Sequence, residues 1–211
     1  MKLHVPSAAR PLCAMTIPVL VAACATAPTM ERPNVPPQGA AWTSAVKVSG
    51  SFGSGSRNAS TTMGMAAWEG RNMLAMKGQP ATIFVDGNGC WVAQSIGGKP
   101  QVSWDPPICY QYPISVGNSW SDARRMTLHQ AKRTIEVKSK WNVEAYEEVN
   151  VPAGTISAFR VTYSDSTGTE RVDWFSPELG LFVKSSVKRT SASPNGPGTF
   201  ESELVSHTIR R

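Results

Sequence analysis

Histidine, cysteine and paired carboxylates, from which metal sites and many active sites are built, are scarce in this sequence. It contains three histidines and four cysteines, and no histidine lies in an HExxH motif or at zinc-ligand spacing from a cysteine. The adjacent Glu147 and Glu148 point to opposite faces of a strand and cannot act as a catalytic pair. The Ser-x-x-Lys run at 185–188 also lies in an alternating strand pattern and lacks its companion motifs. We therefore expect no catalytic residue, no metal and no cofactor, and we lean towards a protein that is not an enzyme.

Long apolar runs and arginine-rich stretches are missing too. The most apolar stretch lies near the amino terminus, where Pro11 and Pro18 interrupt it, so it is too short to cross a bilayer as a helix. The net charge is +6, but basic residues are mixed with acidic ones and no nucleic-acid-binding motif is present. The sequence therefore predicts neither a membrane-spanning helix nor a nucleic-acid partner.

Residues 1–23 have the pattern of an export signal, with Lys2 and Arg10 before a short apolar stretch and small residues before Cys24. The run from Val21 to Cys24 resembles the lipobox of bacterial lipoproteins. The resemblance implies cleavage before Cys24 and attachment of a diacylglyceryl group to its thiol through a thioether. A further acyl chain, such as palmitate, on the new amino terminus would make the anchoring to the lipid bilayer stable.

The same resemblance implies a location. Ala25, rather than aspartate, follows the cysteine, which in that class of protein implies the outer membrane, with the chain on its periplasmic side. The alternative is a soluble secreted or periplasmic protein that is cut after Ala27, in which Cys24 has no special role. Residues 24–41 contain four prolines and are predicted to be an extended spacer. Such a spacer would bury no apolar surface and would hold the domain up to about 50 Å from the lipid.

Residues 42–211 are predicted to form a single periplasmic β-domain. The strongest turn signal is the Asp-Gly-Asn-Gly run at 86–89, whose central residues tolerate positive φ. From Ile135 to Ala145, apolar and polar residues alternate as in a strand with one wet face. The turn spacing predicts roughly nine to eleven antiparallel strands in a strongly curved sheet, either a sandwich or a partial barrel. Residues 121–133 fit a strand or a helix, and we favour the strand.

Two cysteines remain after processing. Cys13 lies in the signal segment and Cys24 at the lipidation site, which leaves Cys90 and Cys109. In an oxidising compartment such a pair is predicted to form a disulfide. A zinc site is the alternative, but two thiols without a histidine at ligand spacing do not complete one.

Tryptophan is abundant, and several of its residues are candidates for a ligand-binding groove. Indole rings stack on sugars or pack against acyl chains, although beside apolar neighbours they more often belong to the core. A basic region between residues 124 and 140 could meet lipid phosphate or cell-wall carboxylates, or could form an ordinary solvated face. The candidate ligand-binding residues are Trp91, Trp120, Trp141, Trp174, Arg124 and Arg125.

Three motifs in the second half of the chain carry a resemblance. Tyr-Pro-Ile-x-Val-Gly-x-x-Trp spans 112–120, Val-Pro-Ala-Gly-Thr spans 151–155, and Trp-Phe-Ser-Pro-x-x-Gly spans 174–180. In this order they resemble a group of bacterial periplasmic and lipoprotein β-domains of unknown function. Ile156 and Phe175 stand where that group has phenylalanine and tyrosine. The resemblance implies a β-rich fold and a periplasmic location, and it transfers no catalytic residue.

Three functional hypotheses follow. The first is a non-catalytic, membrane-anchored periplasmic module that binds an envelope component or a partner protein. The second is a carrier or sensor of a hydrophobic ligand, with tryptophans lining a cavity. The third is a hydrolase of envelope polymer, which requires His129 or His207 within hydrogen-bond reach of a serine or carboxylate in a cleft.

Overall fold

The computed structural model describes residues 27–209, whose regular structure consists of strands. The strands are β1 (Ala41–Gly50), β2 (Gly55–Trp68), β3 (Arg71–Gly78), β4 (Ala81–Val85), β5 (Trp91–Ile96), β6 (Lys99–Ile108), β7 (Ser119–Leu128), β8 (Arg133–Val151), β9 (Gly154–Asp165), β10 (Thr169–Ser176), β11 (Leu181–Arg189) and β12 (Gly198–His207). In this part of the chain, no helix is long and apolar enough to cross a membrane.

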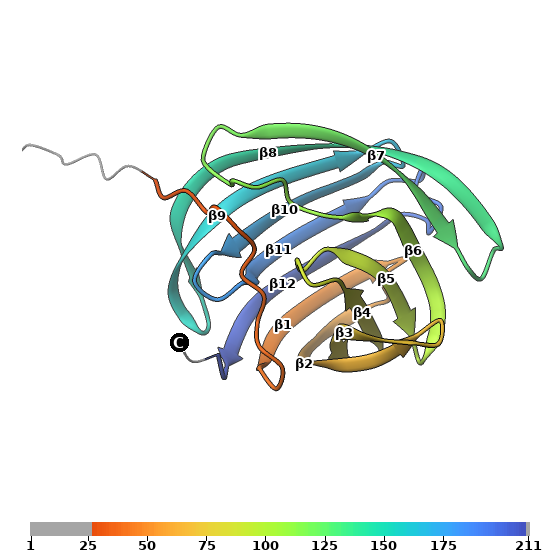
Figure 1. Ribbon diagram of the computed structural model, residues 1–211, viewed down its shortest axis with the longest axis horizontal. Coiled ribbons are helices and arrows are strands. Elements are labelled where there is room, and N and C mark those ends of the chain that lie inside the picture. Colours follow the sequence, from red (N-terminus) through yellow and green to blue (C-terminus); the bar gives the residue numbers. More distant parts are fainter. Residues whose placement is uncertain (1–26, 210–211) are drawn as a thin grey trace, which may run out of the picture.

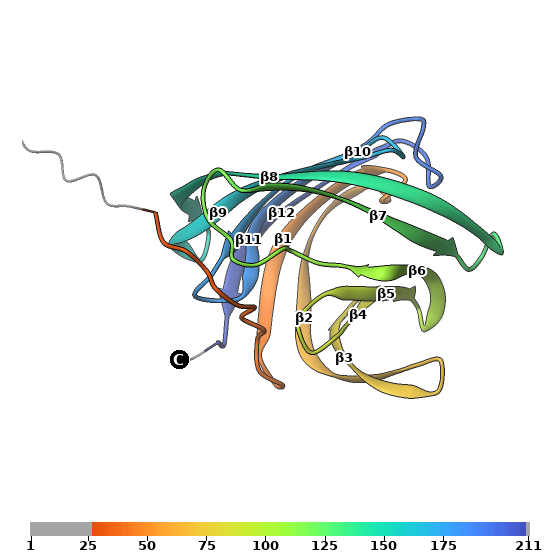
Figure 2. The same ribbon diagram turned by 45° about the horizontal axis from the view of Figure 1, so that its top comes forward.

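Each strand pairs antiparallel with the next one along the chain, and β12 pairs with β1, so the sheet closes into a barrel. Strands β8–β12 and β1 form one long curved wall, and β2–β6 curl beside it (Figures 1 and 2). The all-β antiparallel architecture is confirmed, whereas the twelve strands and the closure correct the predicted nine to eleven strands in a sandwich or partial barrel. The closing pair brings Val46 opposite Ser202, a contact too distant in sequence for any local pattern to reveal.

Strand β8 shows most clearly how the sequence sets the fold. Val137, Trp141 and Val143 are buried, while Lys138 and Lys140 between them are exposed, as the period-two pattern predicts. Its register with β9 shifts between Val143 and Ala145. Such a bulge moves one residue out of the ladder and bends the strand, which fits the curvature of this wall.

Residues 121–133 form most of β7, a short turn and the first residue of β8, so the strand assignment is confirmed. The ambiguous residues are fixed by their partners on both sides. Met126 lies opposite Trp104 of β6 and Ile135 of β8. Pairing on two edges outweighs the weak local preference.

The apolar core is divided into three clusters. The first contains Met63, Leu181, Val183 and Leu204, and the third contains Trp68, Ala75, Phe84 and Ala93. The second contains Trp141, Val143, Phe159, Val161 and Phe175, and it is completed by Met30 and Ile114, which lie outside the strands. The second cluster therefore joins the barrel wall to two irregular segments, and these position the sites described below.

Candidate functional site

Residues 27–40, which we call the strap, cross the wall of β9–β12 before the chain enters β1 (Figures 1 and 2). Met30 pairs with Ile114 through two backbone hydrogen bonds of 2.8 and 2.9 Å. The side-chain amide of Asn34 donates to the carbonyl oxygens of Pro177 and Glu178 at 2.7 and 3.0 Å. The strap is therefore fixed to the barrel at these two places. It is fixed again at its end, where the Gly39 amide donates to the Met63 carbonyl at 2.9 Å and the Met63 amide to the Ala40 carbonyl at 2.8 Å.

The strap corrects one expectation. Met30, Pro36 and Ala40 are buried, so the prediction that this proline-rich stretch buries no apolar surface is wrong. Proline has no N–H group to satisfy, so an extended segment can lie against the barrel with few hydrogen-bond partners. From Met30 onward, the segment does not act as a free spacer.

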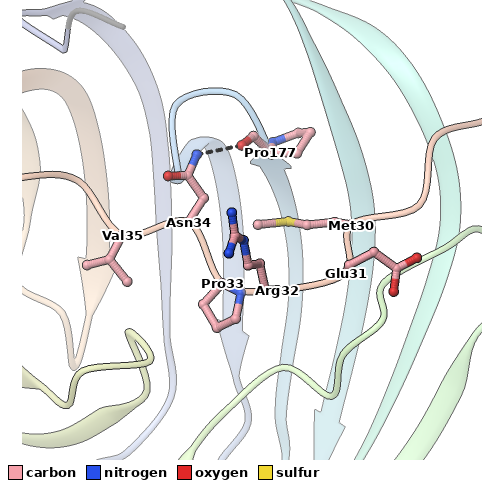
Figure 3. Close-up of a pocket in the computed structure, with 7 residues that line it drawn as sticks. All are labelled: Met30, Glu31, Arg32, Pro33, Asn34, Val35 and Pro177. Atoms are coloured by element: carbon pink, nitrogen blue, oxygen red, sulfur yellow. Dashed lines mark hydrogen bonds between the residues drawn. The ribbon is translucent and has the colours of Figure 1, made fainter.

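A hollow of about 660 Å³ lies beside the strap and is lined by residues 30–35 together with Pro177 (Figure 3). The guanidinium of Arg32 lies between the thioether of Met30 and the carboxamide of Asn34, whereas the carboxylate of Glu31 points away from them. The lining of this hollow thus combines one cationic, one amide and one carboxylate side chain with several apolar ones.

A row of three aromatic residues and one arginine, which we call the aromatic row, crosses the barrel wall. Trp120, Trp141, Tyr163 and Arg171 lie directly opposite one another on β7–β10, and residues paired in this way share a face. The rings of Trp120 and Trp141 stack with centroids 5.5 Å apart, and Tyr163 contacts Trp141 at 4.5 Å. The structure thus brings together two of the predicted tryptophans, and both belong to or pack against the second core cluster.

The predicted disulfide between Cys90 and Cys109 is present. Each cysteine is followed by an aromatic residue that reaches this row. The ring of Tyr110 contacts Trp141 at 5.5 Å, and the ring of Trp91 lies 4.8 Å from the guanidinium carbon of Arg171. The disulfide therefore holds the ends of two strands at the aromatic row.

The predicted residue Arg124 lies in the wall and not on the surface. Its side chain is 2% exposed, and it pairs with Asp122 and donates to the hydroxyl of Ser139 at 3.2 Å. Asp122 also accepts hydrogen bonds from Ser139 at 2.5 Å and from the indole of Trp141 at 3.1 Å. At this depth Arg124 ties β7 to β8 and cannot reach a ligand.

Arg171 was not among the residues predicted from the sequence. It forms an ion pair with the buried Asp173, which in turn accepts a hydrogen bond from Ser185 at 2.6 Å. The guanidinium carbon of Arg171 also lies 4.8 Å from the ring centroid of Phe182. Burial lowers the pKa of Arg171, but the Asp173 carboxylate together with Tyr110 and Tyr163 more than compensates, so the pKa is raised overall. The only sequence signal was an arginine inside an alternating strand.

The tyrosines near this row titrate above their ordinary range. Burial raises the pKa of Tyr112 to about 12. Burial, followed by the Asp173 carboxylate, raises the pKa of Tyr110. Burial and then the Asp165 carboxylate, which accepts a 2.7 Å hydrogen bond from the Tyr163 hydroxyl, raise the pKa of Tyr163. These phenols stay neutral at physiological pH and do not supply a general base.

A second hollow, of about 620 Å³, lies on β7, β8 and β9 and is lined by residues 119–121, 140–142 and 162–164. Side chains alternate between the faces of a strand, so Trp120, Trp141 and Tyr163 point to one face of the sheet and their neighbours in the lining to the other. We call this site the outer hollow. The polar side chains of its lining are, besides the Tyr163 hydroxyl, those of Ser119, Ser121, Lys140, Asn142, Thr162 and Ser164.

The remaining predicted residues lie elsewhere. The indole of Trp174 donates to Glu147 at 2.7 Å, outside the aromatic row. Arg125 pairs with Asp105, and their side chains are 71% and 69% exposed. The basic region around residues 124–140 is thus partly neutralised by its own acidic neighbours, which is typical of a solvated face.

His129 meets one requirement of the hydrolase hypothesis. Its Nε2 lies 2.9 Å from the hydroxyl oxygen of Ser103, and its ring packs edge-on against the buried Trp68 at 5.5 Å. Within residues 27–209, however, no carboxylate forms a hydrogen bond or ion pair with His129, and neither hollow includes the pair. A working triad also needs an orienting group and an open cleft. His207 is exposed.

The predicted signal segment 1–23 and lipidation site Cys24 lie outside the described residues.

No protein-family model matches this chain, and no curated protein matches it. Among solved structures, the chain matches a Bacteroides fragilis protein described as having a YmcC-like fold, with a TM-score of 0.46 and 15% identity over 85% of this chain and 99% of that chain. It also matches the hypothetical lipoprotein YmcC of Escherichia coli, with a TM-score of 0.45 and 11% identity over 81% of this chain and 89% of that chain. A third match is a Parabacteroides distasonis protein described as a lipoprotein, with a TM-score of 0.41 and 11% identity over 85% of this chain and 99% of that chain. We transfer no residue role from likenesses this distant.

Proposed function

We propose that this protein is a non-catalytic periplasmic binding module, anchored to the outer membrane through Cys24, which binds an acidic glycan of the cell envelope at the outer hollow. The lipobox-like run that ends at Cys24 supports the location. The polar lining of the outer hollow supports the ligand class. This lining is the observation that carries the proposal.

The outer hollow presents its polar groups in a fixed arrangement. Three of them, Ser121, Lys140 and Ser164, lie directly opposite one another across β7–β9. The second row is Ser119, Asn142 and Thr162. Hydroxyl and carboxamide groups both donate and accept hydrogen bonds, as sugar hydroxyls do, and a paired sheet holds such groups about 5 Å apart. The hollow is therefore suited to a polyhydroxylated ligand.

Lys140 gives the hollow its preference for acidic sugars. It is the only charged residue in the lining, and it has no ion-pair partner among residues 27–209. Its neighbour Lys138, by contrast, pairs with Glu136 at 3.4 Å. An unpaired ammonium beside hydroxyl groups attracts a carboxylate on the ligand.

Calorimetric titration of the purified, detergent-solubilised protein with oligogalacturonate tests the ligand class, with dextran oligosaccharide as the neutral probe. We expect saturable binding of oligogalacturonate that weakens as salt is added, because exposed charges are screened. Lys140→Met should lower the affinity about fivefold, since an exposed ion pair contributes about 1 kcal/mol. Lys47→Met, which removes another exposed lysine, from β1, is the control and should bind like wild type. Equal binding of both sugars, or equal losses in both variants, would refute the glycan proposal.

The anchor is tested separately by measuring the intact mass of protein extracted from membranes. We expect the loss of residues 1–23 and the added mass of acyl chains on Cys24. A chain that still begins at Met1, or a processed chain without fatty acid, would refute the anchor.

A further inference from the structure

The strap shortens the free part of the tether. Met30 is held by its two backbone hydrogen bonds to Ile114, and Asn34 is held at the turn that follows β10. Six peptide steps separate Cys24 from Met30, and together they span at most about 20 Å. An acyl anchor on Cys24 would therefore keep the barrel close to the membrane, whereas a free spacer ending at residue 41 would reach more than twice as far.

The direction in which the chain leaves the barrel follows from the same bridge. Met30 and Ile114 pair antiparallel, so residues before Met30 run past residues that follow Ile114. The latter form a turn closed by the hydrogen bond from the Asn118 amide to the Ser115 carbonyl at 3.1 Å. Val116 in this turn is 41% exposed and is one of three large apolar residues that are exposed in the described chain. The tether thus leaves the barrel beside an exposed apolar residue.

We propose that the turn at 115–118 lies against the lipid surface and that the docked strap sets this orientation of the barrel. The proposal rests on the lipid anchor of the proposed function and adds the face that the barrel turns to the bilayer. The far end of β7, with the turn at 129–132, then points away from the membrane, because ten strand residues separate the two turns.

The contact depends on the tether and has little affinity of its own. One half-exposed valine buries little apolar area. The charges of Glu31 and Arg32 in the strap have opposite sign, so they cancel in their attraction to anionic lipid. A short linker, however, raises the effective concentration of the two surfaces to the millimolar range. Weak complementarity is then sufficient to orient the barrel, and the orientation should be insensitive to salt.

The experiment places the photoreactive residue benzoylphenylalanine at position 116 or, as the matched control, at position 132 of the full-length precursor expressed in cells. Lipid adducts are counted after illumination of intact membranes. We expect about ten times more adduct at position 116 than at position 132, because the short tether concentrates lipid on one side of the barrel. A Gly/Ser insertion of about 15 residues between Ala27 and Pro28 adds about 20 Å of flexible chain and should remove most of this difference.

The same samples separate failure of this inference from failure of the anchor. Acyl chains on Cys24 with equal adducts at both positions would overturn the orientation and leave the anchor intact. An unchanged preference for position 116 after the insertion would show that the strap does not set the orientation, and would overturn that part. A mature chain without acyl groups would overturn the anchor and the orientation together.

Discussion

The indole N–H of Trp141 donates to the carboxylate of Asp122, with 3.1 Å between Nε1 and Oδ2. The same carboxylate pairs with Arg124 and accepts the hydroxyl of Ser139. One acid on β7 thus satisfies three groups in the wall of the barrel, including a guanidinium that is nearly inaccessible to water. Among the described residues, Asp122 is the one carboxylate that pairs with this buried guanidinium, through its Nη2 nitrogen.

Replacing Asp122 with alanine should destabilise the fold strongly. It leaves the buried Arg124 charge without its ion-pair partner, which costs about 3–5 kcal/mol. Asp105→Ala removes the partner of the exposed Arg125 and should cost less than about 1 kcal/mol. Urea denaturation with the disulfide intact measures both. Combining Asp122→Ala with Arg124→Met should recover much of the loss, and similar losses for the two single variants would contradict the role of burial.

Loss of the disulfide should also destabilise the protein. Cys90 and Cys109 close a loop with a sequence separation of 19, and a loop of that length contributes about 3 kcal/mol in the chain-entropy model. The double variant Cys90→Ser/Cys109→Ser should lower the urea midpoint accordingly without leaving a reactive thiol. Peptide mapping after thiol alkylation of the native protein is the complementary measurement. Free alkylation at either position would contradict the bridge.

Stability should fall in alkaline solution. The pKa of Tyr112 is raised to about 12 by burial, and those of Tyr110 and Tyr163 are raised as well, whereas an unfolded tyrosine titrates near about 10. The stabilisation of the neutral phenols is fully present below that pH. Above it the unfolded chain loses protons first, so the free energy of unfolding decreases as the pH rises. Urea midpoints measured from neutral to alkaline pH should show this decline.

Tyr110→Phe isolates one contribution to the pH dependence. The hydroxyl of Tyr110 is buried without a hydrogen-bond partner among the described residues, so its removal should leave stability at neutral pH unchanged or slightly higher. The alkaline decline of the urea midpoint should become shallower in this variant. A slope identical to that of the wild type would show that Tyr110 ionises as easily in the folded protein as in the unfolded chain.

The parts of the fold that the sequence predicts are those encoded locally. The buried face of β8 follows from the alternation around Trp141, and the disulfide follows from the two cysteines that remain after processing. The pairing of β1 with β12 was not predictable, because Val46 meets Ser202 only once ten intervening strands have formed. The strand count depended on that closure as well.

The site residues show the same limit. Arg124 was chosen because basic residues are dense around it, yet its burial depends on Asp122 and on the pairing of β7 with β8. The sequence around Arg171 has no such density of basic residues, and the neighbours of Arg171 in the structure, Trp91 and Phe182, come from β5 and β11. The proline-rich composition of residues 24–41 likewise predicted a free spacer, because no local pattern shows that Met30 pairs with Ile114.

Gly180, at the turn between β10 and β11, tests how the strap is held. Its φ is +67°, and a Cβ atom there would lie 2.3 Å from the carbonyl oxygen of Asn34. Gly70 has a similar φ of +74° with nothing within 4 Å of its Cβ position. Alanine at either position costs about 1–2 kcal/mol in backbone strain, but only Gly180→Ala should push the strap away from the barrel.

Hydrogen exchange read by mass spectrometry separates the two effects. In Gly180→Ala, the peptides that contain the paired amides of Met30 and Ile114 should exchange faster, because displacement of Asn34 loosens the neighbouring bridge. Gly70→Ala should lose a similar amount of global stability and leave these peptides as slow as in the wild type. If Gly180→Ala leaves them equally slow, the close approach of Asn34 to this turn does not hold the strap, and its backbone hydrogen bonds to Ile114 and Met63 are sufficient.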